Sequence, residues 1–226
     1  VEEVVHSGWI TMGEKTKEFE GRFAEFLGND AKVAAVSNGT AALHLALLAL
    51  GIGDGDEVLI PSLTFVADIN TVLLVGAKPV LADCRSLTDW NMDPADIERK
   101  ITPNTKAVMI VHYAGFPCDM DAIADICKRH NLRLIEDCAH APGARYKGKP
   151  VGTFGDIGCF SFFTNKNLSM GEGGAVTTTS AEMDQEMRYV RAHGMTALTL
   201  DRHKGRAISY DVMRPGLNYR IDEMRA

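Results

Sequence analysis

The sequence predicts an α/β protein built on a mostly parallel sheet that helices cover on both faces. Two observations predict this class. Segments that read as strands alternate along the chain with segments that read as helices. Several of the strand segments are continuous apolar runs, which is typical of strands buried on both faces. A chain of 226 residues is also long enough to bury a sizeable core.

The expected elements follow in order along the chain. Phe19, Phe23 and Phe26 recur at helical spacing, which predicts an amphipathic helix over 14–27 that ends at Gly28. Apolar runs and helix-start signals predict further helices from about 40 to Gly51, from 65 to 74, and over 94–100, 120–130 and 181–193. The expected strands cover 32–36, 57–60, 77–82, 105–111, 132–135, 157–162 and 174–178. The last residues read as the opening of one more helix with Asp222 as its N-cap, so we expect further chain beyond them.

Composition and charge exclude several classes of protein. The apolar fraction of 46% and the charged fraction of 24% are those of an ordinary soluble globular protein. The net charge of −6, without any run of Lys or Arg, argues against a nucleic-acid binder. No apolar run approaches the roughly 18 residues of a membrane span, and the first residues do not have the pattern of a signal peptide. We therefore expect neither a nucleic-acid nor a membrane partner.

The five cysteines are scattered through apolar segments. None of them forms a CxxC pair, and no Cys/His pair has zinc-finger spacing. This pattern is typical of reduced core cysteines, so we expect a cytoplasmic protein without a metal site.

Ligands of open α/β sheets bind outside the carboxyl ends of the strands. The polar residues that follow expected strand ends are therefore the candidates for a site. They lie at 37–40 and 62–65, at Asp83, His112, Asp137 and His140, and in the segment around Lys166.

The stretch SNGTAAL predicts a small turn between a strand and a helix. Backbone N–H groups at a helix N-terminus attract anions, so Gly39 and Thr40 could seat a phosphate. The same residues also make an ordinary N-cap. The nearby stretch GIGDGD and the later GEGGAV match neither the dinucleotide fingerprint nor the P-loop, so a dinucleotide site is not supported.

Three more residues each allow a functional and a purely structural interpretation. Asp137 ends an apolar strand, where a carboxylate needs either a nearby Arg or Lys or a ligand cation such as a protonated ring nitrogen. His140 could contact the same ligand, although a lone histidine is more often structural. Phe65 at a helix start is either core or a flat wall for a planar ring.

Lys166 lies in FSFFTNKNLSMGEGGAV, between an apolar strand and a glycine-rich turn. A solvated loop lysine is the ordinary interpretation. Imine chemistry needs an amine that can lose its proton, and a partly desolvated position between strands favours this. A phosphate seat, an aromatic wall, a carboxylate for a ring nitrogen and a lysine for an aldehyde are together what pyridoxal phosphate (PLP) requires.

The motifs SNGTAALHLALLALGIGDGDEVLIPSLTFVAD, IEDCAHAPGARYKGKPVGTFGDIGCFSF, NKNLSMGEGGAVTT and GLNYRIDE occur in this order. With them the chain resembles the DegT/DnrJ/EryC1/StrS family of PLP-dependent sugar aminotransferases over nearly its whole length. The resemblance implies a fold-type-I large domain over residues 1–226, with an N-terminal arm over 1–30. Family members continue into a smaller C-terminal domain that this sequence does not contain.

The resemblance also implies roles for particular residues. Lys166 corresponds to the Schiff-base lysine and Asp137 to the partner of the pyridine nitrogen. His140 takes a place beside the ring and its phenolic oxygen that is often glutamine in the family, and Phe65 matches the ring-stacking aromatic.

The remaining correspondences concern the cofactor phosphate. Gly39 and Thr40 match the phosphate-binding turn, and Ser161 matches a hydroxyl ligand of the phosphate. Asn218 matches an asparagine that reaches the cofactor phosphate of the neighbouring subunit, so a homodimer with shared active sites is implied.

The implied reaction moves an amino group from an amino acid, glutamate being the expected donor, to a nucleotide-linked keto-sugar. Three alternatives stay open. Family relatives that act as sugar dehydratases carry histidine in place of the lysine, which Lys166 argues against. A non-catalytic regulatory relative would not need the Asp137/Lys166 pair, and another fold-type-I enzyme, such as a desulfurase or lyase, would not need the NYR segment. The sugar, its nucleotide and the aminated position are not predicted.

Overall fold

The computed structural model describes residues 1–28, 30–197 and 199–226. Within these ranges, seven strands form one sheet in the order β1-β9-β8-β5-β4-β2-β3. The strands are β1 (Lys32–Val36), β2 (Glu57–Pro61), β3 (Lys78–Ala82), β4 (Thr105–Val111), β5 (Arg133–Asp137), β8 (Ile157–Ser161) and β9 (Gly174–Thr178). Strand β9 runs antiparallel to both of its neighbours, and the pairs from β8 through β3 are parallel. The predicted mostly parallel sheet is thus confirmed.

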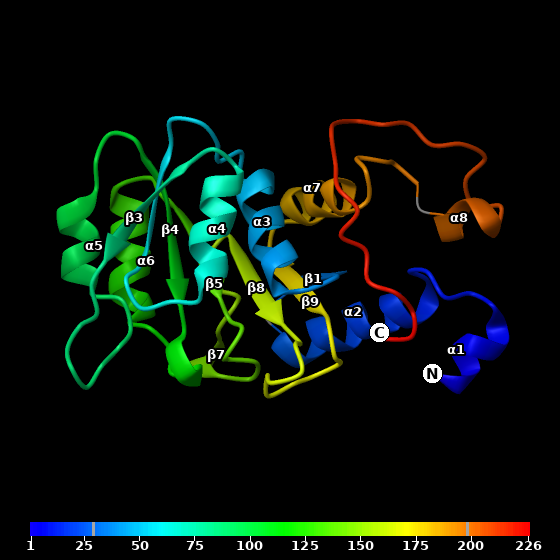
Figure 1. Cartoon of the computed structure of the whole chain (residues 1–226), viewed down its shortest axis with the longest axis horizontal. Coiled ribbons are helices and arrows are strands. Elements are labelled where there is room, and N and C mark those ends of the chain that lie inside the picture. The colour runs from blue at the N-terminus through cyan, green and yellow to red at the C-terminus, as the bar shows by residue number, and fades with distance from the viewer. Residues whose placement is uncertain (29, 198) are drawn as a thin grey trace.

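Helices cover both faces of this sheet (Figure 1). One layer contains α3 (Gly39–Ala49), α4 (Val66–Leu74) and α7 (Ala181–Arg191), whose apolar residues pack in one core with alternate strand residues such as Ala34 and Met109. The other face carries α2 (Glu14–Leu27), α5 (Pro94–Lys100) and α6 (Met120–Arg129), which pack on the intervening residues such as Val33 and Val108. This alternation follows from the two-residue period of a strand.

Local sequence explains where the helices begin and end. Asn38, Asp93, Asp119 and Ser180 each accept a backbone N–H bond at a helix N-terminus, which satisfies one of the unpaired donors there. Helix α3 is apolar nearly all round because it lies between the sheet and the helices α4 and α7.

The sequence missed several short elements. They are α1 (Glu2–Ser7), the 3₁₀ turn η1 (Tyr113–Gly115), the small hairpin of β6 (Arg145–Tyr146) and β7 (Lys149–Pro150), and α8 (Thr199–His203). Each is too short to give a periodic pattern. The expected arm over 1–30 contains the whole of α1 and α2, and its residue Asn29 lies outside the described residues.

The last residues form a first helical turn at Asp222, where we expected a helix to open: the Asp222 carbonyl accepts the N–H of Ala226 at 3.3 Å. Residues 223–225 make a turn, in which the Asp222 side chain accepts the backbone N–H of Arg225 at 3.0 Å as an N-cap would. Asp222 forms a bridge with Thr11, and the carboxylate of Glu223 accepts the backbone N–H groups of Gly13 and Thr16 at 2.6 and 2.9 Å. Because Glu223 satisfies the start of α2, the last residues stay against the N-terminal segment (Figure 1).

No helix in the described ranges is long and apolar enough to cross a membrane. The five cysteines are free in the described structure, and burial raises the pKa of the Cys118 and Cys127 thiols to about 12.

A buried ion-pair network fixes α2 and α7 to the edge strand β1. Glu20 accepts bonds from Arg191 at 2.6 Å, from Arg188 at 2.7 Å and from the backbone N–H of Ala35 at 2.9 Å. Only 1% of the Arg191 side chain is exposed. Burial alone would raise the pKa of Glu20, but the guanidinium groups of Arg191 and Arg188 hold it below the usual value.

We predict that Arg191→Met lowers the free energy of unfolding by about 3–5 kcal/mol at neutral pH, because it leaves the Glu20 carboxylate buried with fewer partners. A carboxylate with a lowered pKa contributes stability above its unfolded pKa and loses it as pH falls through the folded pKa. The deficit of the variant should therefore shrink toward about pH 4. Urea titrations of the wild type and the variant at neutral pH and at about pH 4 measure this deficit in the free energy of unfolding.

Arg22→Met, on the exposed surface of α2, is the control and should cost below about 0.5 kcal/mol at either pH. A deficit in Arg191→Met that is equal at both pH values would show that lost packing, and not the charge of Glu20, causes the effect.

Candidate active site

A cavity of about 800 Å³ opens at the carboxyl ends of the parallel strands. Its walls come from the ends of β4, β5 and β8, from the starts of α3 and α4, and from the segment after β8. Seven of the eight residues predicted for the site line it: Gly39, Thr40, Phe65, Asp137, His140, Ser161 and Lys166. The eighth, Asn218, is exposed and forms a bridge with Ala192, so it lies outside this lining.

One end of the cavity is suited to an anion. Helix α3 begins here, and the Asn38 side chain accepts the N–H of Ala41 at 2.8 Å. The first turn of a helix leaves the earlier N–H groups, those of Gly39 and Thr40, without intrahelical partners. Ser161 packs so closely on this turn that a Cβ at Gly39 would lie 2.7 Å from its Cβ. Glycine is therefore required for this approach of the turn to the hydroxyl.

The other polar part of the cavity contains the carboxyl group of Asp137 and the side chain of Lys166. Asp137 is 6% exposed, and its Oδ1 accepts the N–H of Ala139 at 2.8 Å. Burial raises the pKa of Asp137, although this amide and the neighbouring side chains of His140, Lys166 and His112 oppose the rise. A cation bound beside Asp137 would lower its pKa and keep it ionised.

Lys166 lies on the connection between β8 and β9, and its backbone N–H closes a turn on the Phe163 carbonyl at 2.8 Å. The residue is half-buried, while its neighbours in the chain are exposed. Lys166 thus comes from a surface segment and lines the cavity wall.

Two aromatic groups flank this part. The His140 ring is half-buried and accepts the Ala114 N–H at Nδ1, at 3.4 Å. Burial and then the charge of Lys166 lower the pKa of His140, which favours a neutral imidazole. Phe65, the residue before α4, is 70% exposed. It is therefore a wall residue, and the alternative that it belongs to the core is wrong.

The sequence analysis did not single out four polar residues that line the cavity. Tyr219 lines the cavity beside the seat for the anion and its hydroxyl is 2.7 Å from Nδ1 of His44. Tyr113, Asn165 and Glu172 also line it. Tyr113 directly follows a strand-end histidine that was noted, so the strand-end argument could have found it. Tyr219 comes from a distant segment that no local pattern connects to the site.

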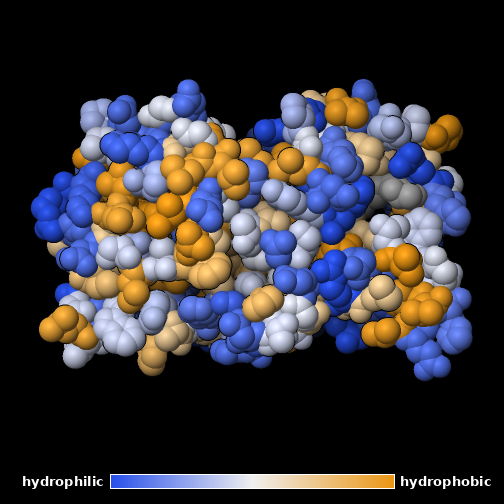
Figure 2. Space-filling model, in the orientation of Figure 1, coloured by the Kyte–Doolittle hydropathy of each residue, from blue (hydrophilic) through white to orange (hydrophobic). Residues whose placement is uncertain are grey.

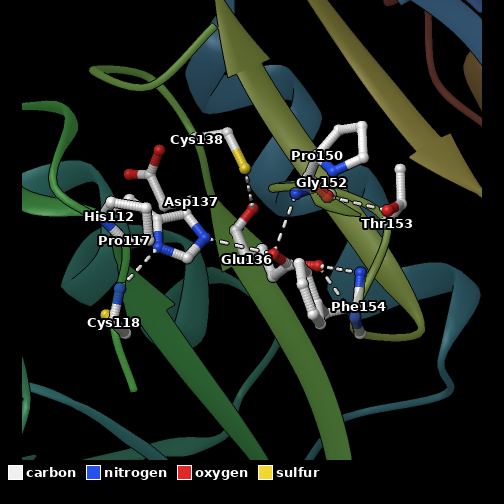
Figure 3. Close-up of polar contacts among 12 residues, drawn as sticks. His112, Pro117, Cys118, Glu136, Asp137, Cys138, Pro150, Gly152, Thr153 and Phe154 are labelled. Carbon is white, nitrogen blue, oxygen red and sulfur yellow. Dashed lines mark hydrogen bonds and ion pairs between the residues drawn. The ribbon is translucent and has the colours of Figure 1, made fainter. Parts of the chain in front are cut away.

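Next to the cavity, His112, Glu136 and Cys138 bring ligand-type atoms within 4.8 Å of one another. Glu136 accepts backbone N–H groups from Gly152, Phe154 and Gly155 at 2.8, 2.7 and 2.7 Å, and its Oε2 lies 3.1 Å from Nε2 of His112 (Figure 3). Nδ1 of His112 accepts the N–H of Cys118, so the Nε2–H tautomer donates to Glu136. These atoms are already engaged in fixing the loop after β7 to β5.

The chain matches the model of the DegT/DnrJ/EryC1/StrS aminotransferase family over residues 1–226. An open α/β sheet with a helix N-terminus, a buried acid and a lysine at one cavity is typical of α/β proteins that bind a phosphorylated ligand. This chain belongs to the DegT/DnrJ/EryC1/StrS aminotransferase family, as the sequence motifs predicted.

Individual relatives agree with this assignment. GDP-perosamine synthase of Escherichia coli O157:H7 is 46% identical to the chain, over the whole chain and 59% of that protein. The solved aminotransferase of Psychrobacter cryohalolentis superposes with a TM-score of 0.91 at 39% identity, over 99% of this chain and 57% of its own. The Streptococcus pneumoniae protein Spr1654 in its PLP form superposes with a TM-score of 0.88 at 31% identity, over 99% of this chain and 59% of its own. The chain thus spans less than two thirds of the length of these relatives.

We predict that Glu136→Gln lowers the free energy of unfolding by about 3 kcal/mol, because an amide group in place of one carboxylate oxygen would face backbone N–H donors. Urea denaturation measures the change. Glu25→Gln, at an exposed position of α2, is the control and should change stability by less than about 0.5 kcal/mol. Equal stability of Glu136→Gln and the wild type would contradict the assigned role of the carboxylate.

Proposed function

We propose that residues 1–226 form the cofactor-binding large domain of a PLP-dependent aminotransferase. The enzyme moves an amino group from an amino acid, with glutamate as the donor, to a nucleotide-linked keto-sugar. One observation carries the proposal: an anion seat, a buried acid and an amine line a single cavity. Family membership and the relatives named above support the same reaction class.

The cavity residues fit PLP group by group. The N-terminus of α3 with Gly39, Thr40 and Ser161 suits the phosphate, since backbone N–H groups and a hydroxyl are its usual partners. The buried carboxyl group of Asp137 suits a protonated ring nitrogen. Exposed Phe65 provides an apolar wall, and neutral His140 provides a polar contact beside the ring. When bound, PLP supplies an aldehyde carbon and a ring that accepts an electron pair.

Within this assignment each residue has a distinct task. The Lys166 amine is the group that would hold the aldehyde carbon of bound PLP, and as a free amine it would serve as the base and acid for the proton at the substrate carbon. Asp137 keeps a proton on the ring nitrogen through its negative charge. The Ala139 N–H holds the orientation of the carboxyl group. The α3 N-terminus and Ser161 would hold the phosphate of bound PLP independently of Lys166.

We also propose that two copies of the protein assemble as a homodimer with shared active sites. Hydrophobic side chains gather on the surface around α4 and β3 (Figure 2). They include Val66, Leu73, Leu74 and Leu81, each about half or more exposed. A contiguous apolar surface of this kind favours burial against a partner. Exposed Asn218 is then available to reach the cofactor phosphate of the neighbouring subunit, as the resemblance implies.

A cytoplasmic location belongs to the same proposal. Five free cysteines, four of them buried, suit a reducing compartment.

We predict that Lys166→Ala, made in the full-length protein, abolishes the visible absorption band that a lysine-bound PLP gives, because the variant has no amine at that position. In the wild type, glutamate should convert the band to the absorption of the aminated cofactor. Lys128→Ala, at an exposed position of α6, is the control and should leave both spectra unchanged.

The possible outcomes separate the alternatives. A wild-type band that glutamate does not change would favour the dehydratase or another amino donor. A protein that never shows the band with added PLP would refute the catalytic assignment of Lys166 and favour a non-catalytic relative.

A further inference from the structure

Asp68 is a buried acid for which the proposed mechanism has no use. It lies in the first turn of α4, one turn after Phe65, and is 0% exposed. Its Oδ2 accepts a hydrogen bond from the Thr64 hydroxyl. Its Oδ1 is buried, and no N–H or O–H donor among the described residues hydrogen-bonds to it. A carboxylate at this depth without a cation is costly.

The group that faces Asp68 is the second acid of the site. The side chains of Asp68 and Asp137 meet in a hydrogen-bond contact between the two carboxyl groups. The Cys159 thiol, on the strand next to Asp137, lies near enough to both carboxyl groups that each raises its pKa. Two carboxyl groups can hydrogen-bond to each other only when one of them carries a proton.

The surrounding charges decide which acid holds the proton. Asp137 has one cationic neighbour, Lys166 after β8, and the imidazole rings of His112 after β4 and His140 after β5 also favour its ionised form. The groups around Asp68 are Asp137, Thr64 and the Cys159 thiol, and none is a cation. Burial first, and then the charge of Asp137, raise the pKa of Asp68 well above its usual value. The proton therefore belongs to Asp68.

We propose that Asp68 is a protonated carboxylic acid that donates its O–H to Asp137. The two side chains then carry one negative charge between them, and Asp137 is held as an acceptor directed at the cavity. Asp68 is a positioning residue, because it acts through Asp137 and does not itself line the cavity. Its donated bond also draws charge away from Asp137 and so tunes how strongly that carboxylate attracts a protonated ring nitrogen. This last consequence rests on the proposed function of Asp137.

The proton itself can be observed in the full-length protein without cofactor. Infrared spectroscopy at neutral pH should show the carbonyl stretch of a protonated carboxylic acid. Asp68→Asn should remove this band, because an amide replaces the acid with nearly the same shape. Asp96→Asn is the matched control: Asp96 is 1% exposed but paired with Arg99 and Lys100, and the variant should keep the band.

The pH dependence of stability gives a second readout. An acid with a raised folded pKa contributes stability that is complete below its unfolded pKa of about 3.9 and is lost as pH rises through the folded pKa. The melting temperature of the cofactor-free wild type should therefore fall relative to that of Asp68→Asn as pH rises from acid to neutral. His112, His140, Lys166 and Cys159 are unchanged in this comparison, so their titration is largely common to both proteins.

Cofactor binding tests the positioning role. Asp68→Asn keeps a donor toward Asp137 and should bind PLP within about threefold of the wild type, whereas Asp68→Ala should bind about tenfold more weakly. A band that persists in Asp68→Asn would overturn the proton assignment. Equal binding by the Asn and Ala variants, or equal loss in both, would overturn the positioning role. If the wild type itself fails to bind PLP, the proposed function fails, and the infrared band still decides where the proton lies.

Discussion

The site depends on two adjacent acidic residues at the end of one buried strand and on how each carboxyl group is satisfied there. Glu136 and Asp137 end β5 in the middle of the sheet, where neither carboxyl group reaches bulk water. Because neighbouring strand residues point to opposite sides, the two have separate environments (Figure 3). Three backbone N–H groups and the neutral His112 satisfy Glu136 within the protein. Asp137 receives one backbone N–H and otherwise faces the cavity and a second acid. One carboxylate stabilises the fold and its neighbour remains available for a ligand.

The rest of the cavity is assembled by the same sheet edge. The anion seat follows β1, the aromatic wall follows β2, and the amine follows β8. These segments are far apart in the chain but meet where the parallel strands end. Strand β9 pairs antiparallel with β8, so Lys166 lies on a hairpin connection held at both ends by neighbouring strands. Helix α3, packed between sheet and outer helices, gives the anion seat a rigid support.

Most of the fold was predictable because its signals are local. The bounds of the helix at 94–100 and of the strand at 105–111 follow from an N-cap, a proline and an apolar run, and the structure agrees with them. The contact of Glu223 with the start of α2 was not predicted, because it joins segments that no local pattern connects. In the site, strand-end polarity identified six of the predicted residues that line the cavity, and the family resemblance added Ser161. Tyr219 and Asp68 were missed, since one arrives from a distant segment and the other lies behind the wall within an apolar helix.

The bond from Gly13 to Glu223 joins residues 210 positions apart, and that from Arg191 to Glu20 spans 171. Contacts of this separation close very long loops, and such closure slows folding. During synthesis, α2 lacks both its N-terminal cap and its partner for Glu20 until nearly the whole of this chain has been made. We therefore expect the parallel core around β4 and β5 to form early, with α2 among the last elements to become fixed. The phenylalanine-rich face of α2 would remain exposed in that interval, so newly made chains are most prone to aggregation just before α2 docks.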